Sequence, residues 1–529
     1  MSGGPTGLLI IGLDAASPAL LHSWAHDGTM PNLGSLIGRG LSADTRGLDG
    51  FCVGSTWPSL YTGLNPARHG VHYLVQIVPG TYALRRMADG QLVHGIPFWR
   101  LASDAGRRVA VLDVPLSQLE PALAGIQTVE WGGHDSLYGF QASPPELATE
   151  LLARHGAHPL SGGCDGDRKT ARDYTDFVDG LLRGCSTKAS WTRELLARGG
   201  WDLFIQVFSE THCVGHQCWH LHDAAHPAHD ASIAAEIGDP VRTVYRAVDA
   251  ALGDILRAAG DTRVVVFSSH GMLHRFGAQF LLGDILVRLG VTEPRRDPTE
   301  VAMRVARRAA VAAWRRLPDR VRRPLRTARA RARPRPAQPV VPVIAADAAR
   351  SLCFPSSNGL ASGGIRLNLV GREPAGRLRP GSEARQFCDR LEGELLEIRE
   401  QRTGKPLVAR VLRTADLFSG PHLDELPDLL VEWNDEVPLG SSALGGGAGS
   451  IVRATSPKIG TLEGRNDYGR SGEHRPGGWF VAAGPGISHG RAQPVSVLDL
   501  APTFAWMLGL DMHQCDGSVI PELRHLTVA

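Results

Sequence analysis

The segment Trp201-Asp-Leu-Phe-Ile-Gln-Val-Phe-Ser-Glu-Thr-His212-Cys-Val-Gly-His216 joins an apolar run to two histidines that are four positions apart. An apolar run of this length is typical of a buried β-strand. If the chain becomes helical after the run, both imidazoles lie on one face of the helix, because residues four apart are neighbours there. The segment therefore predicts a strand followed by a helix whose histidines reach a single ion.

Three further fragments carry metal-competent side chains next to apolar runs. Leu8-Leu-Ile-Ile-Gly-Leu-Asp14 and Val264-Val-Val-Phe-Ser-Ser-His270-Gly-Met place such a side chain after the run, whereas in Gly472-Glu-His474-Arg-Pro-Gly-Gly-Trp-Phe-Val-Ala-Ala-Gly the histidine comes before it. In open α/β sheets, ligands bind outside the carboxyl ends of the strands. The four fragments together predict a metal site at the rim of one sheet.

The length and charge of the chain indicate a large globular protein. At 529 residues the chain exceeds an ordinary single core, so we expect one large domain with insertions, or two domains. Its 56 basic and 54 acidic residues nearly balance. This balance gives no reason to expect a nucleic-acid polymer or a membrane surface as the partner.

Cysteine usage and the N-terminal run favour a cytoplasmic protein. The eight cysteines do not suggest a disulfide framework in a chain this long, which favours a reducing compartment. The first apolar run lacks a basic flank and leads into Asp14, so we interpret it as a strand and not as a signal peptide. No run approaches the roughly 20 apolar residues of a membrane span. The oligomeric state is left open.

Strand and helix patterns alternate along the chain and predict a largely parallel sheet. We therefore expect an α/β fold with a mostly parallel central sheet flanked by helices, and a smaller α+β insert. The expected strands cover residues 8–13, 108–115, 201–208, 263–268 and 479–484, and the expected helices cover 170–199, 239–259, 382–399 and 497–508. In the fragment Trp131-Gly-Gly-His134-Asp135, the last two residues either line a pocket or, more commonly for such a pair, lie in a solvated loop, and we prefer the solvated loop.

An abrupt change of composition divides the chain. Between Met303 and Pro336 there are thirteen arginines and a single acidic residue, Asp319. Such a run marks either an anionic, phosphate-rich partner or, more commonly, a solvated linker. The expected parts are the first part of a catalytic core (1–290), an arginine-rich insert or linker (291–345), a smaller insert or cap (346–450) and the second part of the core (451–529).

Two hydroxyl residues, Ser55 and Thr56, precede Pro58 at an expected helix start. A hydroxyl at a helix N-terminus lies at the positive end of the helix dipole, beside free backbone N–H groups. Such a place suits a nucleophile or a phosphoryl oxygen. It also suits an ordinary Ser or Thr N-cap, which is the commoner role.

In this order the fragments resemble the alkaline phosphatase superfamily and, within it, the type I phosphodiesterase/nucleotide pyrophosphatase branch. The resemblance covers nearly the whole chain apart from the arginine-rich insert and implies an alkaline phosphatase-like fold. It rests on Gly12-Leu-Asp14 with Met30-Pro-Asn-Leu, Trp57-Pro-Ser-Leu-Tyr-Thr-Gly-Leu-Asn-Pro-Ala-Arg-His-Gly, the His212/His216 pair, Ser268-Ser-His270-Gly-Met, Gly472-Glu-His474-Arg-Pro-Gly-Gly, and Ser496-Val-Leu-Asp-Leu-Ala-Pro-Thr with Asp516-Gly517.

The family holds two divalent ions, usually zinc, with a Ser or Thr nucleophile between them. The resemblance implies one site from His212, His216 and His474, and a second from Asp14, His270 and the nucleophile. This chain has His212 and Ser269 where the family usually has aspartates. Three neutral imidazoles are a good zinc set, whereas the Ser269 hydroxyl is a weak ligand. We expect one firmly bound zinc and a second ion that is weakly bound, different or absent.

The segment that would hold the nucleophile departs from the family pattern. Counting back about nine positions from Thr62-Gly63, as the family pattern suggests, reaches Val53, which cannot attack. Thr56 heads a Thr-Trp-Pro similar to the family's Thr-Phe-Pro, and we prefer it to Ser55. A third alternative is a water activated by zinc, with no protein nucleophile.

These features predict a metal-dependent phosphoesterase, of the phosphodiesterase or nucleotide pyrophosphatase type, acting on a small-molecule phosphoester. The alternatives are a phosphoryl-type transferase and a degenerate, non-catalytic relative that binds a phosphorylated ligand. A sulfatase-like esterase using Cys52 is disfavoured because the Cys-x-Pro-x-Arg pattern is absent there. The sequence does not identify the leaving group.

Overall fold

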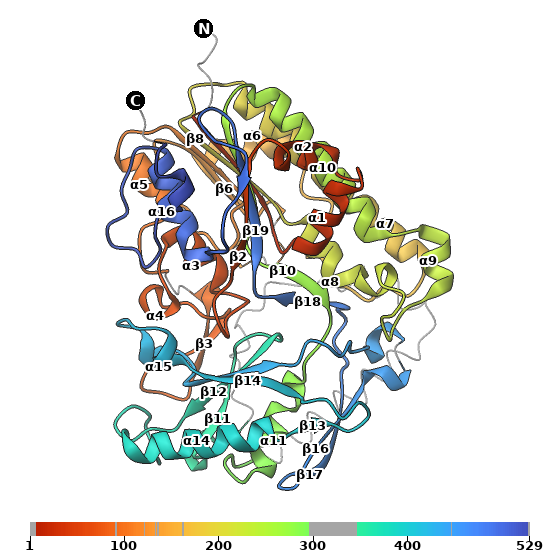
Figure 1. Cartoon of the computed structure of the whole chain (residues 1–529), viewed down its shortest axis with the longest axis vertical. Coiled ribbons are helices and arrows are strands. Elements are labelled where there is room, and N and C mark those ends of the chain that lie inside the picture. The colour runs from red at the N-terminus through yellow and green to blue at the C-terminus, as the bar shows by residue number, and fades with distance from the viewer. Residues whose placement is uncertain are drawn as a thin grey trace.

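The computed structural model describes residues 7–89, 93–120, 122–132, 134, 137–160, 163–295, 346–445 and 447–526. The arginine-rich stretch from Met303 to Pro336 lies outside the described residues. The prediction that this stretch binds an anionic partner or forms a linker therefore concerns residues that the structure does not describe. Figure 1 shows a larger part built around a twisted sheet and a smaller part below it, which carries the long helix α14 (Ser382–Leu396).

In the described part of the chain, ten strands form the central sheet, in the order β20-β2-β19-β9-β1-β8-β5-β6-β7 with β21 also paired to β2. Strand β1 (Leu8–Leu13) lies between β8 (Leu203–Phe208) and β9 (Arg263–Ser268) and is parallel to both. Strands β19 and β7 run antiparallel to their neighbours. The expected mostly parallel sheet is confirmed. Its other strands are β2 (Leu41–Arg46), β5 (Val109–Leu112), β6 (Gly125–Val129), β7 (Gln141–Ser143), β19 (Gly478–Ala483), β20 (Gly490–Arg491) and β21 (Val495–Ser496).

Helices cover both faces of this sheet, which explains the unbroken apolar run of β1. Leu9 and Ile11 belong to the hydrophobic core on one face, and Leu8 and Ile10 belong to the core on the other. Figure 1 shows α1, α2, α7 and α10 on one side and α3, α5 and α16 on the other. The bounds are α1 (Pro18–His26), α2 (Pro31–Ile37), α3 (Thr56–Thr62), α5 (Phe98–Asp104), α7 (Ala171–Leu196), α8 (Glu210–His222), α10 (Pro240–Ala259) and α16 (Leu500–Met507).

The smaller part has its own hydrophobic core around a four-stranded antiparallel sheet, in the order β11-β12-β15-β14. A three-stranded sheet, β13-β16-β17, lies beside it. The bounds are β11 (Cys353–Ser356), β12 (Ser362–Leu367), β13 (Arg399–Glu400), β14 (Val408–Arg413), β15 (Leu429–Trp433), β16 (Ile451–Ser456), β17 (Gly460–Arg465), α11 (Leu282–Arg288) and α15 (Thr414–Leu417).

A short pair of strands connects the two halves of the larger part. Strand β10 (Gly271–His274), just after β9, pairs antiparallel with β18 (Gly472–Arg475), and Met272 lies opposite His474. This pairing carries His474 to the end of the sheet where β1, β8 and β9 finish. The other short elements are α4 (Pro66–His69), β3 (Val75–Ile77), β4 (Leu84–Arg86), α6 (Pro145–His155) and α9 (Ala231–Ile237).

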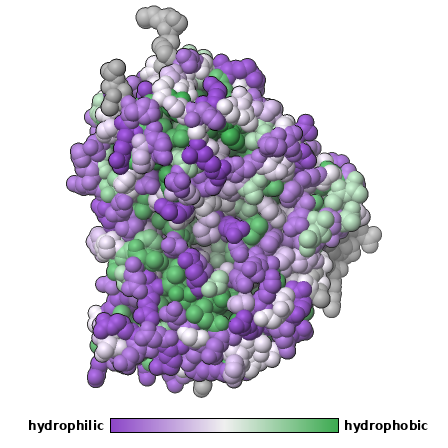
Figure 2. Space-filling model, viewed as in Figure 1, coloured by the Kyte–Doolittle hydropathy of each residue, from purple (hydrophilic) through white to green (hydrophobic). Residues whose placement is uncertain are grey.

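Figure 2 shows the molecule from the same side as Figure 1. The surface on this side is mostly hydrophilic, and hydrophobic side chains gather in its lower central area. Among the described residues, no helix is both long enough and apolar enough to cross a membrane.

Candidate metal centre

Five ligand-competent side chains meet at the carboxyl end of the central sheet. Asp14 directly follows β1, and His270 follows β9. His212 and His216 lie on α8, which begins immediately after β8, so the expected strand followed by a helix is confirmed. His474 is in β18. All five are buried, with relative exposures of 5% or less.

Three imidazole nitrogens converge on one point. His474 Nε2 lies 2.8 Å from His212 Nε2 and 3.0 Å from His216 Nε2. His212 Nδ1 lies 2.9 Å from the Asp14 carboxylate, and His216 Nδ1 lies 2.8 Å from the Gly472 carbonyl oxygen. Both of these oxygens only accept hydrogen bonds. Each Nδ1 therefore carries the ring proton, and the Nε2 lone pairs of His212 and His216 both point towards His474.

This arrangement fits a zinc ion. His474 Nε2 has at most one proton to donate, so it can satisfy only one of the two facing lone pairs, and the other donor nearby is an Arg470 N–H group at 3.3 Å from His216 Nε2. A cation shared by the three Nε2 atoms satisfies all of them. A metal-bound histidine typically donates its other N–H to a carboxylate or a carbonyl, as His212 and His216 do here.

Burial favours the neutral form of His216, His474 and His270, which is the form that binds metal. Burial lowers the pKa of His216 well below its usual value, and Arg470 and His474 lower it further. Burial, followed by the proximity of His270 and His212, lowers the pKa of His474 in the same way. The pKa of His270 falls to about 4 because burial outweighs the opposing attraction of Asp14.

Asp14 is held ionised and fixed in orientation. Its Oδ1 accepts a hydrogen bond of 2.9 Å from Trp57 Nε1, and its Oδ2 faces His212. Burial alone would raise the pKa of Asp14, but the charge and the hydrogen bond of His212, with help from His270 and Trp57, lower it well below its usual value. Trp57 was not predicted as a site residue, and it ties the start of α3 to the metal centre.

The donors for a second ion are fewer. His270 Nε2 is buried and has no hydrogen-bond partner, so one ligand atom is available beside Asp14. Ser269 Oγ lies 2.9 Å from His270 Nδ1 and therefore orients that ring. Ser269 does not line the neighbouring pocket, whereas Asp14 and His270 do.

An open pocket of about 610 Å³ leads to the centre. Thr56 lines this pocket together with Asp14, His212, His270 and His474. The Thr56 hydroxyl donates a 3.0 Å hydrogen bond to the Cys52 carbonyl oxygen. Ser55 does not line the pocket, and its Oγ is buried without a hydrogen-bond partner. Of the two predicted nucleophiles, Thr56 is the one that faces the site.

His134 belongs to the same group of buried histidines, although its segment was predicted to be a solvated loop. Its relative exposure is 8%, and its ring centroid lies 4.1 Å from that of His212. His134, His212 and His216 each offer a ligand atom within 4.8 Å of the others. The available signal was its position a few residues after β6, at the same end of the sheet.

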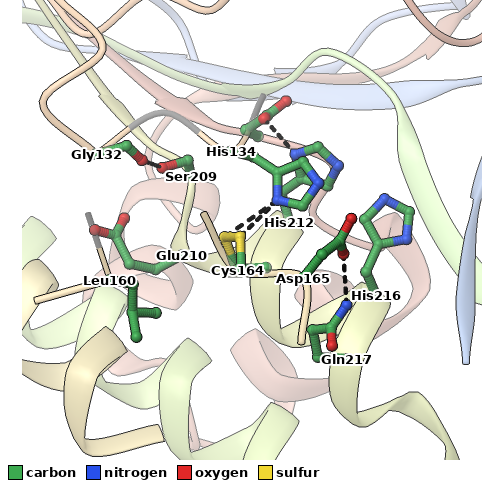
Figure 3. Close-up of a disulfide and its surroundings, with 12 residues drawn as sticks. Gly132, His134, Leu160, Cys164, Asp165, Ser209, Glu210, His212, His216 and Gln217 are labelled. Carbon is green, nitrogen blue, oxygen red and sulfur yellow. Dashed lines mark hydrogen bonds and ion pairs between the residues drawn. A yellow bond between two sulfur atoms is a disulfide. The ribbon is translucent and has the colours of Figure 1, made fainter. Parts of the chain in front are cut away.

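A disulfide lies against the cluster, as Figure 3 shows, between Cys164 and Cys213. The other six cysteines are free. The Cys164–Cys213 disulfide was not predicted from the sequence. Arg470 was also missed, and its guanidinium reaches His134 Nε2 at 2.9 Å and pairs with Asp165.

Comparison with known proteins gives one family match. A family model described as type I phosphodiesterase/nucleotide pyrophosphatase matches residues 8–337. No curated protein matches the chain.

The chain is also similar to solved structures of low sequence identity. One is phosphonoacetate hydrolase from Sinorhizobium meliloti 1021 in complex with phosphonoacetate, with 14% identity, a TM-score of 0.48, and coverage of 96% of this chain and 98% of that chain. Another is murine ectonucleotide pyrophosphatase/phosphodiesterase 5, with 10% identity, a TM-score of 0.44, and coverage of 99% of this chain and 100% of that chain.

Proposed function

The chain belongs to the type I phosphodiesterase/nucleotide pyrophosphatase family of phosphoester hydrolases, and from this premise we propose that its buried centre cleaves a small-molecule phosphodiester or pyrophosphate. The observation that carries the proposal is the convergence of the Nε2 atoms of His212, His216 and His474. These three residues would hold zinc. Asp14 and His270 would hold a second, weaker ion.

Bound zinc would supply Lewis-acid polarisation of a phosphoryl oxygen. The protein residues position the reacting groups. Asp14 and the Gly472 carbonyl hold the rings of His212 and His216 with their lone pairs turned inward. The Trp57 bond to Asp14 fixes the start of α3 and with it the neighbouring Thr56.

Thr56 is the proposed nucleophile. The Thr56 hydroxyl would first give up its hydrogen bond to the Cys52 carbonyl oxygen and pass its proton to water. Its Oγ1 would then attack phosphorus in line and expel the alcohol or phosphate leaving group, which takes up a proton from water. Water would finally hydrolyse the ester between Thr56 and the phosphoryl group that retains the other half of the substrate. Support for Thr56 over Ser55 comes from its place on the pocket wall.

The pocket wall indicates the class of leaving group. Besides the metal-competent side chains, the lining includes the apolar residues Val53, Leu74, Val114, Pro115 and Leu116 and the acidic residues Asp113 and Glu130. An apolar wall favours a leaving group with a flat or hydrophobic surface over a free inorganic phosphate. We further propose a cytoplasmic location, because six of the eight cysteines are free.

The test is hydrolysis by the purified full-length chain of bis(p-nitrophenyl) phosphate, a diester, compared with p-nitrophenyl phosphate, a monoester. We expect metal-dependent cleavage with a preference for the diester, loss of activity on chelation, and recovery when zinc is added back. Zinc should be present in elemental analysis of the purified protein. Unchanged activity after complete removal of metal would overturn the proposal. Tight binding of a phosphorylated ligand without any turnover would instead support the non-catalytic alternative.

A further inference from the structure

His134 lies between two groups of ligand-competent side chains. On one side are the rings of His212 and His216, and on the other is the disulfide of Cys164 and Cys213. The ligand atoms of His134, Cys164 and Cys213 all lie within 4.8 Å of one another, and all three residues are buried. His134 Nδ1 is 2.5 Å from Cys164 Sγ and 3.5 Å from Cys213 Sγ. Figure 3 shows the imidazole directed at the sulfur atoms.

We propose that reduction of this disulfide creates a separate zinc site from Cys164, Cys213 and His134, which we call the thiolate site. Two thiolates and one imidazole form a soft donor set that suits zinc and leaves a fourth position open. Disulfide sulfurs carry no charge and are poor ligands, because the thiolate is the form that binds metal. The oxidised protein therefore lacks this site, and the reduced protein has it. The proposal does not depend on phosphoester hydrolysis.

The chemistry of the step is balanced by a dithiol reductant. The reductant gives two electrons and two protons to the Cys164–Cys213 bond, so that two thiols form and the reductant becomes a disulfide. Zinc then binds both sulfurs as thiolates, and the two thiol protons pass to solvent. No other oxidant or reductant is required.

A zinc-bound His134 would need an outer partner that accepts a hydrogen bond from its second ring nitrogen. Binding through Nδ1 places the ring proton on Nε2, which in the structure faces Arg470 Nη2 at 2.9 Å. The same guanidinium pairs with Asp165. Because a guanidinium only donates hydrogen bonds, Arg470 would have to turn away from an Nε2–H group. The Asp165 carboxylate, which is close enough for its charge to interact with His134, would then be the candidate acceptor, and a carboxylate is a common outer partner of metal-bound histidines.

Two structural links couple the thiolate site to the imidazole centre. Cys213 directly follows His212 on α8, and the rings of His134 and His212 are 4.1 Å apart between centroids. His134 also lines the open pocket, which gives an ion a route to the thiolate site. Oxidation or reduction at the two sulfurs thus acts directly beside the proposed reaction centre.

The full-length protein is incubated anaerobically with excess zinc, with and without a phosphine reductant, and the zinc that stays bound per chain after desalting is counted. A phosphine carries no thiols that compete for zinc. In parallel, thiols are titrated after denaturation. We expect reduction to expose two additional thiols and to raise the zinc content by about one ion per chain. Because the readout is a difference, it is independent of whether the imidazole centre binds zinc or hydrolyses phosphoesters.

Variants locate the additional ion. Cys164→Ser and Cys213→Ser should gain no zinc on reduction, whereas Cys515→Ser, which removes a half-buried free thiol outside the cluster, should gain zinc as the unaltered protein does. Cobalt loading of the reduced, unaltered protein should produce thiolate-to-cobalt charge-transfer absorption, a readout that needs no variant to fold. Two new thiols without additional zinc and without this absorption would overturn the proposal. If the unaltered protein is isolated in the reduced form, an equal zinc content in that protein and in the Cys164→Ser variant would also overturn the proposal.

Discussion

His474 Nε2 lies 2.8 Å from His212 Nε2, although 262 positions separate the two residues in the chain. One residue comes from the helix after β8 and the other from the short strand β18, which is held in place by β10. The contact joins the two halves of the larger part of the molecule at a single buried point.

This contact predicts that His474→Ala removes the zinc of the imidazole centre. Loss of one of three imidazoles should weaken zinc binding by at least about 100-fold, since even the outer partners of metal ligands are worth 10- to 100-fold. The zinc content after dialysis against a weak chelator measures the effect. His222→Gln is the matched control, because His222 is on the same helix α8 and pairs with Asp239 outside the centre. Equal zinc retention by the two variants would contradict the shared site.

The nucleophile can be assigned by three substitutions. Thr56→Ala should lower the rate of hydrolysis by on the order of 10³-fold or more, because no hydroxyl remains to attack phosphorus. Thr56→Ser should keep most of the activity, and Ser55→Ala should change it by less than about tenfold, since Ser55 does not line the pocket. The initial rates on a diester substrate, together with zinc contents, measure these effects. Full activity in Thr56→Ala would mean that no threonine nucleophile operates here.

Much of the centre could be predicted from sequence because its residues stand next to strongly apolar strands. Asp14 and His270 follow β1 and β9, and the His212/His216 pair follows β8 at helical spacing. Position after a buried parallel strand fixes which end of the sheet a residue occupies. The sequence alone therefore predicts that these residues meet at the rim of the sheet.

The remaining residues were not predicted to be part of the centre, because loops bring them close to it. His134 follows β6 through a glycine-containing turn, and Arg470 precedes β18, so neither shows a periodic pattern. Cys164 and Cys213 are 49 positions apart and pair only because the segment after α6 packs against α8. Sequence spacing carries no information on such packing.

Ser269→Asp should create a stronger second metal site. The Ser269 side chain is fully buried next to His270, where an aspartate would add the carboxylate that the family usually has. Without a cation, a second buried carboxylate should lower the melting temperature, because two buried negative charges repel each other and each disfavours the ionised form of the other. Divalent ions should raise the melting temperature more than in the unaltered protein, and the metal content should rise by about one ion. Ser269→Asn, which is neutral and similar in size, is the control and should show neither change.

Acid should destabilise the protein as the pH falls below about 6.5, and His69 should contribute to this loss. Its Nδ1 accepts a 3.1 Å hydrogen bond from the Val71 N–H group, its Nε2 lies 2.8 Å from Ser59 Oγ, and burial lowers its pKa to about 3. Between pH 6.5 and 3 the unfolded chain binds more protons at this site than the folded chain does, so stability rises with pH there. The slope for one such group is at most ~1.4 kcal/mol per pH unit. His69→Gln should therefore flatten the dependence of the melting temperature on pH between 6.5 and 4, whereas His26→Gln, at an exposed position, should leave it unchanged. An equal dependence in both variants would show that His69 does not contribute to the acid sensitivity.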